Sequence, residues 1–517
     1  ATSMRARTVS LTFLWIFAWA AAVPALAVEE PPAIVAAAEQ GKIDEVRSLV
    51  AAGASLETKD HLGSTALAKA AELGRLDVVA WLIEQGADVE TKGRQAHTPL
   101  MQAAGKNHPE VVRHLLAHRA SALAKSQRGV TALSMAAEQG AGEVVAALIE
   151  AGAVPDSKDV DGNTPLMWAA TSEVAKQLLD AGANLGARNQ TGNTPAMLAA
   201  ARGQLPVVQF LADAGAPLDS ASQKGYTALG LAAERGHAAV VEYLIERGLD
   251  VKHRDVEGNT PLIWASTPDV ARILLDHGAE LTATNRRGSN ALMQAAFHGR
   301  LEVVQLLAER GADPNARTQS GFSALSMACE NGHVHVAQWL VDEGVDVDRP
   351  DTAGNTPLIW AAKSGRSEIV ELLLDHKADA KARSKTGVTT LMGAATYGHQ
   401  EVARRLIEAG ADVAARDSTG STALMSAAYR GHVDTAGVLI AAGAKVNEQT
   451  AKGYTALSMA AEKGHTELVR LLLAKGADPL SHDAQGRAAL DWAKEKGHTD
   501  IVDLLETAIG KNAKSAE

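Results

Sequence analysis

The sequence predicts an all-α solenoid, an elongated superhelix of helix-turn-helix units joined by short β-hairpin-like turns. Gly354 to Asp379 show the pattern of one unit, GNTPLIWAAKSGRSEIVELLLDHKAD, and this pattern recurs about every 33 residues. Thr356 and Pro357 predict a helix start, because a Thr hydroxyl accepts hydrogen bonds from free backbone N–H groups and Pro at the first helical position loses none. Two short helices with apolar stripes follow. Neither can bury its stripe without neighbouring units, so the repetition itself predicts the solenoid.

The first 27 residues are expected to be a secretory signal peptide. Arg5 and Arg7 precede an apolar run over residues 11–23, and Ala25-Leu26-Ala27 has the small residues of a cleavage site. This run of 13 residues is shorter than the roughly 20 that a membrane-spanning helix needs. Cleavage is therefore favoured, and retention as a membrane anchor is the alternative. We expect an exported chain, periplasmic or extracellular, with no integral membrane span after cleavage.

Repeats are expected to fill residues 28–510 as one domain. The predicted N-terminal cap is 28–60, because Ile34 to Ala54 contain two helices without the Thr-Pro opening. Internal repeats follow over 61–483 and a C-terminal cap over 484–510, which makes about fifteen helix pairs. The polar tail, 511–517, is expected to be disordered. The capping Thr position falls at Thr65, Thr98, Thr131, Thr164, Thr194, Thr227, Thr260, Asn290, Ser323, Thr356, Thr389, Thr422, Thr455 and Ala488.

This pattern resembles the ankyrin repeat, a 33-residue unit of a turn and two antiparallel helices. Gly225 to Asp250 and Gly453 to Asp478 match it closely, and the resemblance covers nearly all of residues 28–510. It implies a non-catalytic scaffold that binds a protein or peptide partner in a concave groove. One consistent difference is that Met or Ile replaces the family's His after Thr-Pro-Leu, at Met101, Met167, Ile263 and Ile359.

Two units are three residues shorter than the others. Thr171-Ser172-Glu173 and Thr267-Pro268-Asp269 replace the usual Gly-His turn, and the spacing to the next capping position falls to 30 residues. Since three residues are close to one helical turn, we expect the stacking of repeats to change at these two junctions.

The position four residues after the capping residue, called the Trp slot here, is a candidate binding surface. It holds Trp168, Trp264, Trp360 and Trp492, and also Met135, Met327 and Met459. Tyr226, Phe322 and Tyr454 directly precede the capping residue one repeat ahead of a Trp. The aromatic side chains either fill the core between short helices or form an exposed row in the groove. Because the slot also accepts Lys69 and Gln102, we expect partial exposure.

Basic residues recur six residues before the capping position, and this series is called the basic ladder here. One interpretation is that they pair with adjacent acids such as Asp255 and Asp417 on a solvated edge, where such pairs contribute about 0–1 kcal/mol. The other is a cationic strip that faces an acidic partner or polyanionic polymer. The ladder includes Lys125, Lys158, Arg188, Arg254, Arg317, Arg383 and Arg416.

Motifs for catalysis are absent from the sequence, which has no nucleophile elbow, phosphate-binding loop or His-Glu-x-x-His pair. His residues of the Gly-His turns, such as His237 and His399, are expected to hydrogen-bond local backbone. His333 and His335 are unsuitably spaced for a metal pair. Cys329, the only cysteine, occupies an Ala position and is expected in the core. We therefore expect no enzyme activity, metal or cofactor.

The net charge of −11 argues against nucleic-acid binding, which depends on basic side chains. The first functional hypothesis is a monomeric, non-catalytic binding scaffold, with an accessory protein or immunity-type inhibitor of an exported enzyme as a special case. The alternative is a structural, elastic spacer of the cell envelope. A clustered aromatic groove would favour the scaffold, and a uniformly solvated surface would favour the spacer.

Overall fold

The structure, a computed structural model, describes residues 31–515, with side chains through residue 510. The expected signal peptide lies outside these residues. The described chain contains thirty α-helices and one short 3-10 helix, Arg94–Ala96, and it divides into two compact units. Unit 1 ends at Asn184 and unit 2 begins at Leu185. The single repeat domain expected over 28–510 stays a prediction.

Unit 1 contains five helix pairs. Their bounds are α1 Ala33–Glu39, α2 Ile43–Ala51, α3 Ala66–Glu72, α4 Leu76–Glu84, α5 Pro99–Gly105, α6 Pro109–Ala117, α7 Ala132–Gln139, α8 Gly142–Glu150, α9 Pro165–Trp168 and α10 Ser172–Asp180.

Unit 2 continues the same alternation of helices. Their bounds are α11 Pro195–Ala201, α12 Leu205–Asp213, α13 Ala228–Arg235, α14 Ala238–Glu246, α15 Pro261–Trp264, α16 Pro268–Asp276, α17 Ala291–Phe297, α18 Leu301–Glu309, α19 Ala324–Asn331, α20 Val334–Asp342, α21 Pro357–Lys363, α22 Ser367–Asp375, α23 Thr390–Tyr397, α24 Gln400–Glu408, α25 Ala423–Arg430, α26 Val433–Ala441, α27 Ala456–Lys463, α28 Thr466–Ala474, α29 Ala489–Lys496 and α30 Thr499–Ser515.

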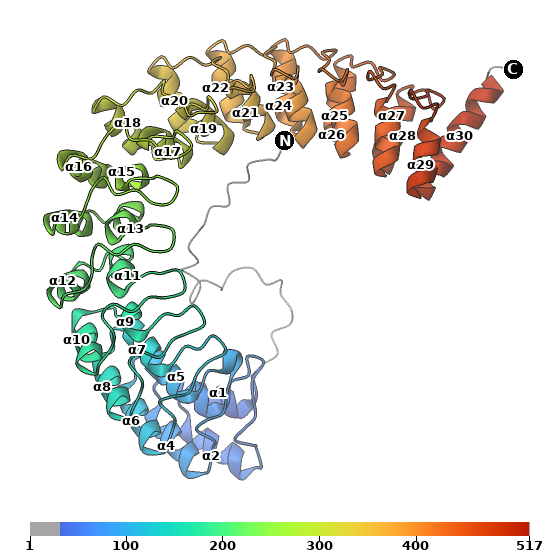
Figure 1. The fold of residues 1–517 in the computed structure, drawn as a ribbon. Helices are drawn as coiled ribbons and strands as arrows, with labels where there is room; N and C mark the ends of the chain where they lie inside the picture. Colours follow the sequence, from blue (N-terminus) through green and yellow to red (C-terminus); the bar gives the residue numbers. More distant parts are fainter. Residues whose placement is uncertain (1–30, 516–517) are drawn as a thin grey trace. The chain divides into compact units, whose positions relative to one another are not determined.

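Within each unit the helices form two layers. Each odd-numbered first helix packs on the first helices before and after it, and the even-numbered second helices do the same (Figure 1). The core lies between these layers, where Leu358, Ile369 and Leu373 are fully buried. Each apolar stripe is thus covered by its own partner helix and by adjacent pairs, which confirms the all-α repeat solenoid predicted from the sequence.

The predicted capping geometry positions the first helices. The Thr356 hydroxyl accepts a hydrogen bond from Ile359 N at 3.4 Å, and Pro357 is the first helical residue. Ala488 has no hydroxyl at this position; instead Asp491 Oδ2 accepts from Ala488 N at 2.8 Å. The Gly after a second helix is left-handed as expected, with φ of 86° at Gly410.

The turns that precede the first helices form short hairpins. Isolated antiparallel bridges join Lys59 to Thr65, Arg317 to Ser323 and Arg383 to Thr389. Neighbouring hairpins also bond to each other through the backbone, as from Val256 N to Lys224 O at 2.9 Å. These contacts fix the spacing between turns in adjacent repeats.

The shortened repeats and the C-terminus depart from the common pattern. First helices α9 and α15 have only four residues, and Thr171 and Thr267 cap the following helices directly, without a glycine turn. The expected change in stacking at these junctions stays a prediction. Helix α30 extends to Ser515, so residues 511–515 are helical where a disordered tail was expected, because the last helix continues past the final repeat contacts.

Candidate functional site

The three tryptophans that occupy the Trp slot in unit 2 are anchored at their indole N–H groups. Trp264 Nε1 donates to Asp255 Oδ2 at 3.0 Å and Trp360 Nε1 donates to Asp351 Oδ2 at 3.1 Å. The Trp492 indole donates to Asp483 Oδ2 at 3.2 Å. These aspartates are buried, and each stands nine residues before its Trp. This pairing was not predicted from the sequence, although the constant nine-residue separation between Asp and Trp was a visible signal.

Each turn aromatic packs against the Trp of the next repeat. Ring centroids are 5.9 Å apart for Tyr226 and Trp264, 4.9 Å for Phe322 and Trp360, and 5.8 Å for Tyr454 and Trp492. Burial, reinforced by the negative charge of Asp255, raises the pKa of Tyr226 to about 12. The aromatic residues selected from the sequence are therefore brought together in pairs across repeats of unit 2.

Exposure separates the ten candidate groove residues into two groups. Trp492 and Met327 are both 7 % exposed and belong to the core, so they are removed from the candidate surface. The Arg487 guanidinium carbon lies 3.6 Å from the Trp492 ring centroid, which explains its burial. The partly exposed residues are Trp168, Tyr226, Trp264, Phe322, Trp360, Tyr454, Met135 and Met459.

Charged groups flank the Trp360 ring. Lys363 Nζ lies 4.8 Å from the ring centroid and donates to Asn355 Oδ1 at 3.0 Å. Burial lowers the pKa of Lys363, whereas the charges of Asp351 and Glu330 act in the opposite direction. Burial also raises the pKa of Glu330. The surface around this Trp thus combines an apolar ring with an ammonium and a carboxylate.

Two exposed tyrosines extend the aromatic surface of unit 2 and were missed from the sequence. Tyr397 and Tyr429, at or near the C-terminal ends of α23 and α25, are 53 % and 43 % exposed. Lys463 Nζ lies 4.6 Å and Arg430 Cζ lies 5.7 Å from the Tyr429 ring centroid. No repeated pattern pointed to these residues, because other repeats carry different residues at their positions.

Histidines of the Gly-His turns connect repeats. The expectation of a local backbone partner is corrected, because each acceptor lies 36 residues earlier, in the last turn of the first helix of the preceding repeat. A Cβ on Gly203 would lie 2.5 Å from His237 Nδ1, so the turn glycine makes room for this ring. The Nε2 contacts, 2.9 to 3.3 Å long, are His108 to Glu72 O, His237 to Ala201 O, His333 to Phe297 O, His399 to Lys363 O, His432 to Thr396 O, His465 to Tyr429 O and His498 to Glu462 O.

His298, next to this series, provides a pH-dependent prediction. Burial, with the charges of Arg300 and His333, lowers its pKa to about 4. Between this value and the ordinary pKa near 6.5, the unfolded chain binds a proton that the folded chain does not, so stability falls as the pH falls through this window. His298→Asn should remove up to about 3 kcal/mol of that dependence. Urea unfolding of both proteins at pH 7 and pH 4.5 measures it.

Asn is the matched replacement for His298, because Asn331 occupies the equivalent position of the next repeat and donates to Met327 O at 2.8 Å. Burial raises the pKa of nearby Glu234, which by itself makes the folded state gain stability as the pH falls. Because this effect is present in both proteins, it cancels when their stabilities are compared. Equal loss of stability on acidification in the two proteins would contradict the prediction.

The basic ladder bonds mainly to backbone rather than to the adjacent acids. Asp255 and Asp417 accept N–H groups of their own turns instead, as from Asn259 N and Ser421 N. Lys158 is exposed. The ladder donors bond to carbonyl groups of the following turn: Lys125 to Lys158 O at 3.0 Å, Arg188 to Ala221 O at 2.8 Å, Arg254 to Thr284 O at 2.7 Å, Arg317 to Pro350 O, Arg383 to Arg416 O at 3.0 Å and Arg416 to Gln449 O at 2.7 Å.

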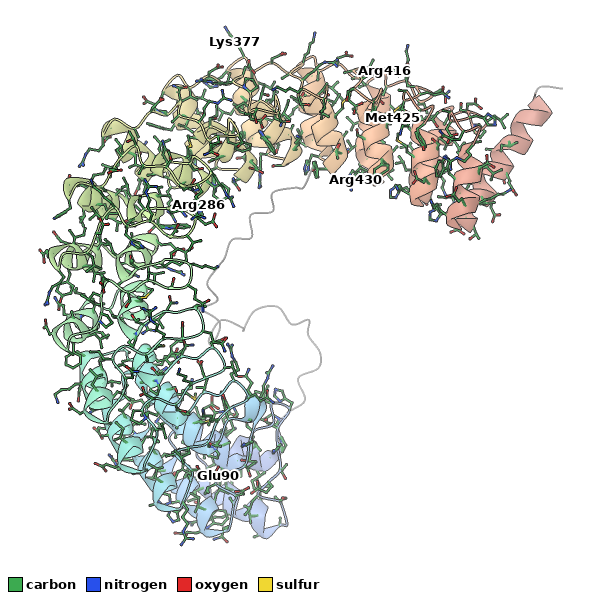
Figure 2. The ribbon with its side chains drawn as sticks, in the orientation of Figure 1. Glu90, Arg286, Lys377, Arg416, Met425 and Arg430 are labelled. Atoms are coloured by element: carbon green, nitrogen blue, oxygen red, sulfur yellow. The ribbon has the colours of Figure 1, made fainter. Side chains whose placement is uncertain are left out.

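Two ladder arginines also contact acids of the next repeat. Arg416 pairs with Glu448, and Arg383 Nη2 lies 4.0 Å from Asp412 Oδ2. Figure 2 shows Arg416 on the turn side of α25 and Arg430 at its other end, with the buried Met425 between them. The ladder therefore connects successive turns by hydrogen bonds. It lies at the N-terminal end of the first helices, whereas the exposed tyrosines lie at their C-terminal end.

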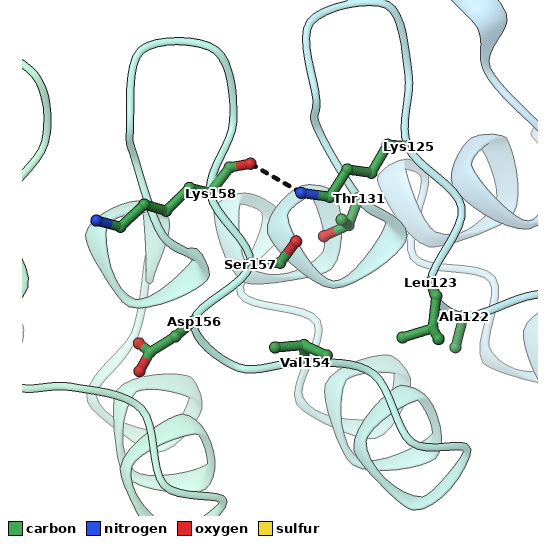
Figure 3. Close-up of a pocket in the computed structure, with 8 residues that line it drawn as sticks. All are labelled: Ala122, Leu123, Lys125, Thr131, Val154, Asp156, Ser157 and Lys158. Atoms are coloured by element: carbon green, nitrogen blue, oxygen red, sulfur yellow. Dashed lines mark hydrogen bonds between the residues drawn. The ribbon is translucent and has the colours of Figure 1, made fainter.

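Two shallow pockets lie between successive turns, one in each unit. The pocket in unit 1, about 440 Å³, is lined by Ala122, Leu123, Lys125, Thr131, Val154, Asp156, Ser157 and Lys158 (Figure 3). The pocket in unit 2, about 460 Å³, occupies the equivalent place and includes Asp348, Asp379 and Arg383. Among the described residues, no group of three or more His, Cys, Asp or Glu side chains could hold a metal ion.

The matches to one family model together cover nearly the whole chain. Comparison with curated proteins gave no match. None of the helices within residues 31–515 combines the length and apolar character needed to cross a membrane. A family model described as ankyrin repeats (3 copies) matches residues 24–93, 100–189, 133–222, 166–255, 214–285, 250–318, 292–384, 377–450 and 438–515.

Proposed function

The chain belongs to the ankyrin-repeat family, whose members generally mediate protein–protein interactions, and we propose that it is a non-catalytic scaffold for a protein or peptide partner. The proposed surface is formed by the first helices and the turn aromatics. The N-terminal segment, residues 1–27, supports the further proposal that the chain is exported to the periplasm or the cell exterior. We propose that it acts as a monomer.

The partly exposed aromatic pairs of unit 2 carry this proposal. Trp264 and Trp360 donate their N–H groups to buried carboxylates, so their rings are held in one orientation before a partner arrives. Such preorganised aromatic side chains bind with little loss of conformational freedom and are frequent energetic centres of interfaces. The accessible ring surface, rather than the N–H edge, is what a partner would contact.

Charge around the aromatic surface adds selectivity. Lys363 at Trp360 and Lys463 at Tyr429 place ammonium groups beside rings, and Glu330 adds a carboxylate near the first. A partner segment with apolar and charged side chains in alternation would match both kinds of group. The basic ladder is left out of the proposed surface, because most of its donors bond to the next turn.

Trp360→Met should weaken binding of a partner captured from the envelope fraction of the source cells by about tenfold or more. Met is chosen because Met327 and Met459 occupy the same slot in other repeats, so the fold tolerates it. Pull-down with the wild-type chain identifies the partner, and isothermal titration calorimetry then compares affinities.

Trp339→Met is the matched control, because Trp339 is also partly exposed but lies on α20, in the layer of second helices. Its affinity should equal that of the wild type. A double variant, Trp360→Met with Trp264→Met, extends the test. If both the single and the double variant keep full affinity, the aromatic surface is ruled out as the binding site.

A further inference from the structure

A repeated contact links successive loops of unit 1 at the edge where each second helix ends. The residue eight positions before the capping residue, called the acceptor slot here, accepts the backbone N–H of the next loop. Glu57 Oε1 accepts from Asp88 N at 2.9 Å, and Glu90 Oε1 accepts from Ser121 N at 2.6 Å. Asp156 Oδ1 does the same for Asn184 N at 2.9 Å. A side-chain carboxylate therefore closes three of the four junctions of this kind in unit 1.

Leu123 breaks the series. It occupies the acceptor slot between Glu90 and Asp156 but has no oxygen to offer, and its side chain is 57 % exposed. The N–H that it would serve belongs to Val154, which has no hydrogen-bond acceptor among the described residues. The Val154 side chain is itself 51 % exposed. This junction thus combines an open backbone donor with two exposed aliphatic side chains.

The unit 1 pocket lies at this same junction. Leu123 and Val154 both line its volume of about 440 Å³, which is within the usual range of ligand pockets, roughly 300–1,000 Å³. Figure 3 shows Lys125 above them, with its ammonium donating to Lys158 O. In the equivalent pocket of unit 2 the slot is filled, because Asp348 Oδ1 accepts from Asp379 N at 2.9 Å.

We infer that the unit 1 pocket binds the C-terminal residue of a partner peptide, one with a free carboxylate and an aliphatic side chain. The carboxylate takes the place of the missing slot carboxylate and accepts the Val154 N–H. The aliphatic side chain packs on Leu123 and Val154. Capture of a terminal carboxylate by backbone N–H groups is an established mode of peptide recognition. The inference rests on the proposed function only in taking a peptide as the ligand.

Charge at the pocket favours an anion. Lys125 has one ammonium hydrogen bonded to Lys158 O and two others free to turn towards a ligand, and the Lys158 side chain is exposed. Asp156 is the one acid that lines the pocket, and it is engaged with Asn184 N. Arg128 and Asp161, nearby on the turn tips, neutralise each other in an ion pair of 2.8 Å. A chain-terminal carboxylate therefore meets a net positive site.

The test measures fluorescence polarisation of a labelled Gly-Ser peptide that ends in Leu, against the full chain. The peptide with a free C-terminus should bind saturably, and its C-terminal amide should bind about tenfold more weakly or worse, because it lacks the charge and one acceptor. Leu123→Glu, which restores the slot residue of the preceding repeat, should also weaken binding about tenfold or more. It should raise the unfolding midpoint by satisfying Val154 N–H.

Ala414→Glu provides a matched control, because Ala414 occupies the acceptor slot of a repeat in unit 2 and its change should leave peptide binding intact. If Leu123→Glu misfolds, Leu123→Asn replaces it, patterned on Asn447, which accepts from Asp478 N at 2.8 Å. Equal binding of acid and amide peptides, or undiminished binding to the folded Leu123 variant, overturns the inference. Trp360→Met separates the two proposals, since it should weaken the captured partner but not this probe.

Discussion

Leu373→Ala should lower the free energy of unfolding of unit 2 by about 2–5 kcal/mol. Leu373 is fully buried on α22, between the first-helix layer and the neighbouring second helices. Alanine would leave a cavity that helices held on both sides cannot close. The loss includes both the transfer of the leucine side chain from water and the contacts that its neighbours give up.

The array should respond by losing cooperativity as well as stability. Each repeat contacts only its neighbours, so a weakened repeat reduces the coupling between the segments on its two sides. Urea unfolding followed by circular dichroism should show a broadened or two-step transition. Leu374→Ala, at a half-buried position one residue further, should cost less and keep the wild-type transition shape. An unaltered single transition for Leu373→Ala would contradict this account.

The helix pairs could be predicted from the sequence because their causes are local and repeated. Thr356 caps its own helix, Pro357 begins it, and the stripe that includes Ile369 and Leu373 is readable at helical spacing. With many copies in register, a single misleading residue changes little. Even Ala488, which has no hydroxyl to cap with, stands at the expected helix boundary, where Asp491 of the first turn accepts the Ala488 N–H.

Contacts between repeats were harder to predict, because their acceptors are backbone carbonyl groups, which every residue type carries. Arg254 donates to Thr284 O and His237 to Ala201 O, and any residue supplies a backbone carbonyl. One of the two interpretations of the ladder therefore paired it with side-chain acids, and Asp255 and Asp417 in fact bind their own turns. The pocket at Leu123 was missed for a related reason, since its meaning depends on what Glu90 does in the preceding repeat.

Burial within a slot also depends on neighbours rather than on the slot itself. Trp360 and Trp492 occupy the same position in their repeats, and each donates to an Asp nine residues earlier, yet only Trp360 is partly exposed. Arg487, present beside the last Trp alone, covers its ring. A repeat pattern predicts the orientation of a side chain, whereas its exposure is set by residues that vary from copy to copy.

Asp351→Ala should destabilise unit 2 by about 2–4 kcal/mol, because one buried carboxylate serves several donors. Asp351 Oδ1 accepts from Ala353 N at 2.9 Å and from Asn355 N at 2.8 Å. Its Oδ2 accepts from Trp360 Nε1 at 3.1 Å and from Asn355 Nδ2 at 3.1 Å. Removal of the carboxylate frees the turn and the indole together, so the variant should also weaken partner binding through Trp360.

A double-mutant cycle separates these effects. Trp360→Phe deletes the indole donor and part of the ring but keeps an aromatic side chain, and its lost hydrogen bond should cost about 1 kcal/mol, whereas Asp351→Ala leaves all the donors without their acceptor. Because both changes remove the same Trp–Asp bond, the double variant should lose less stability than the two single losses combined. Strictly additive losses would mean that the indole N–H contributes nothing through Asp351, and the preorganisation of the aromatic surface would then have to come from the contacts of the ring with Phe322 and Lys363.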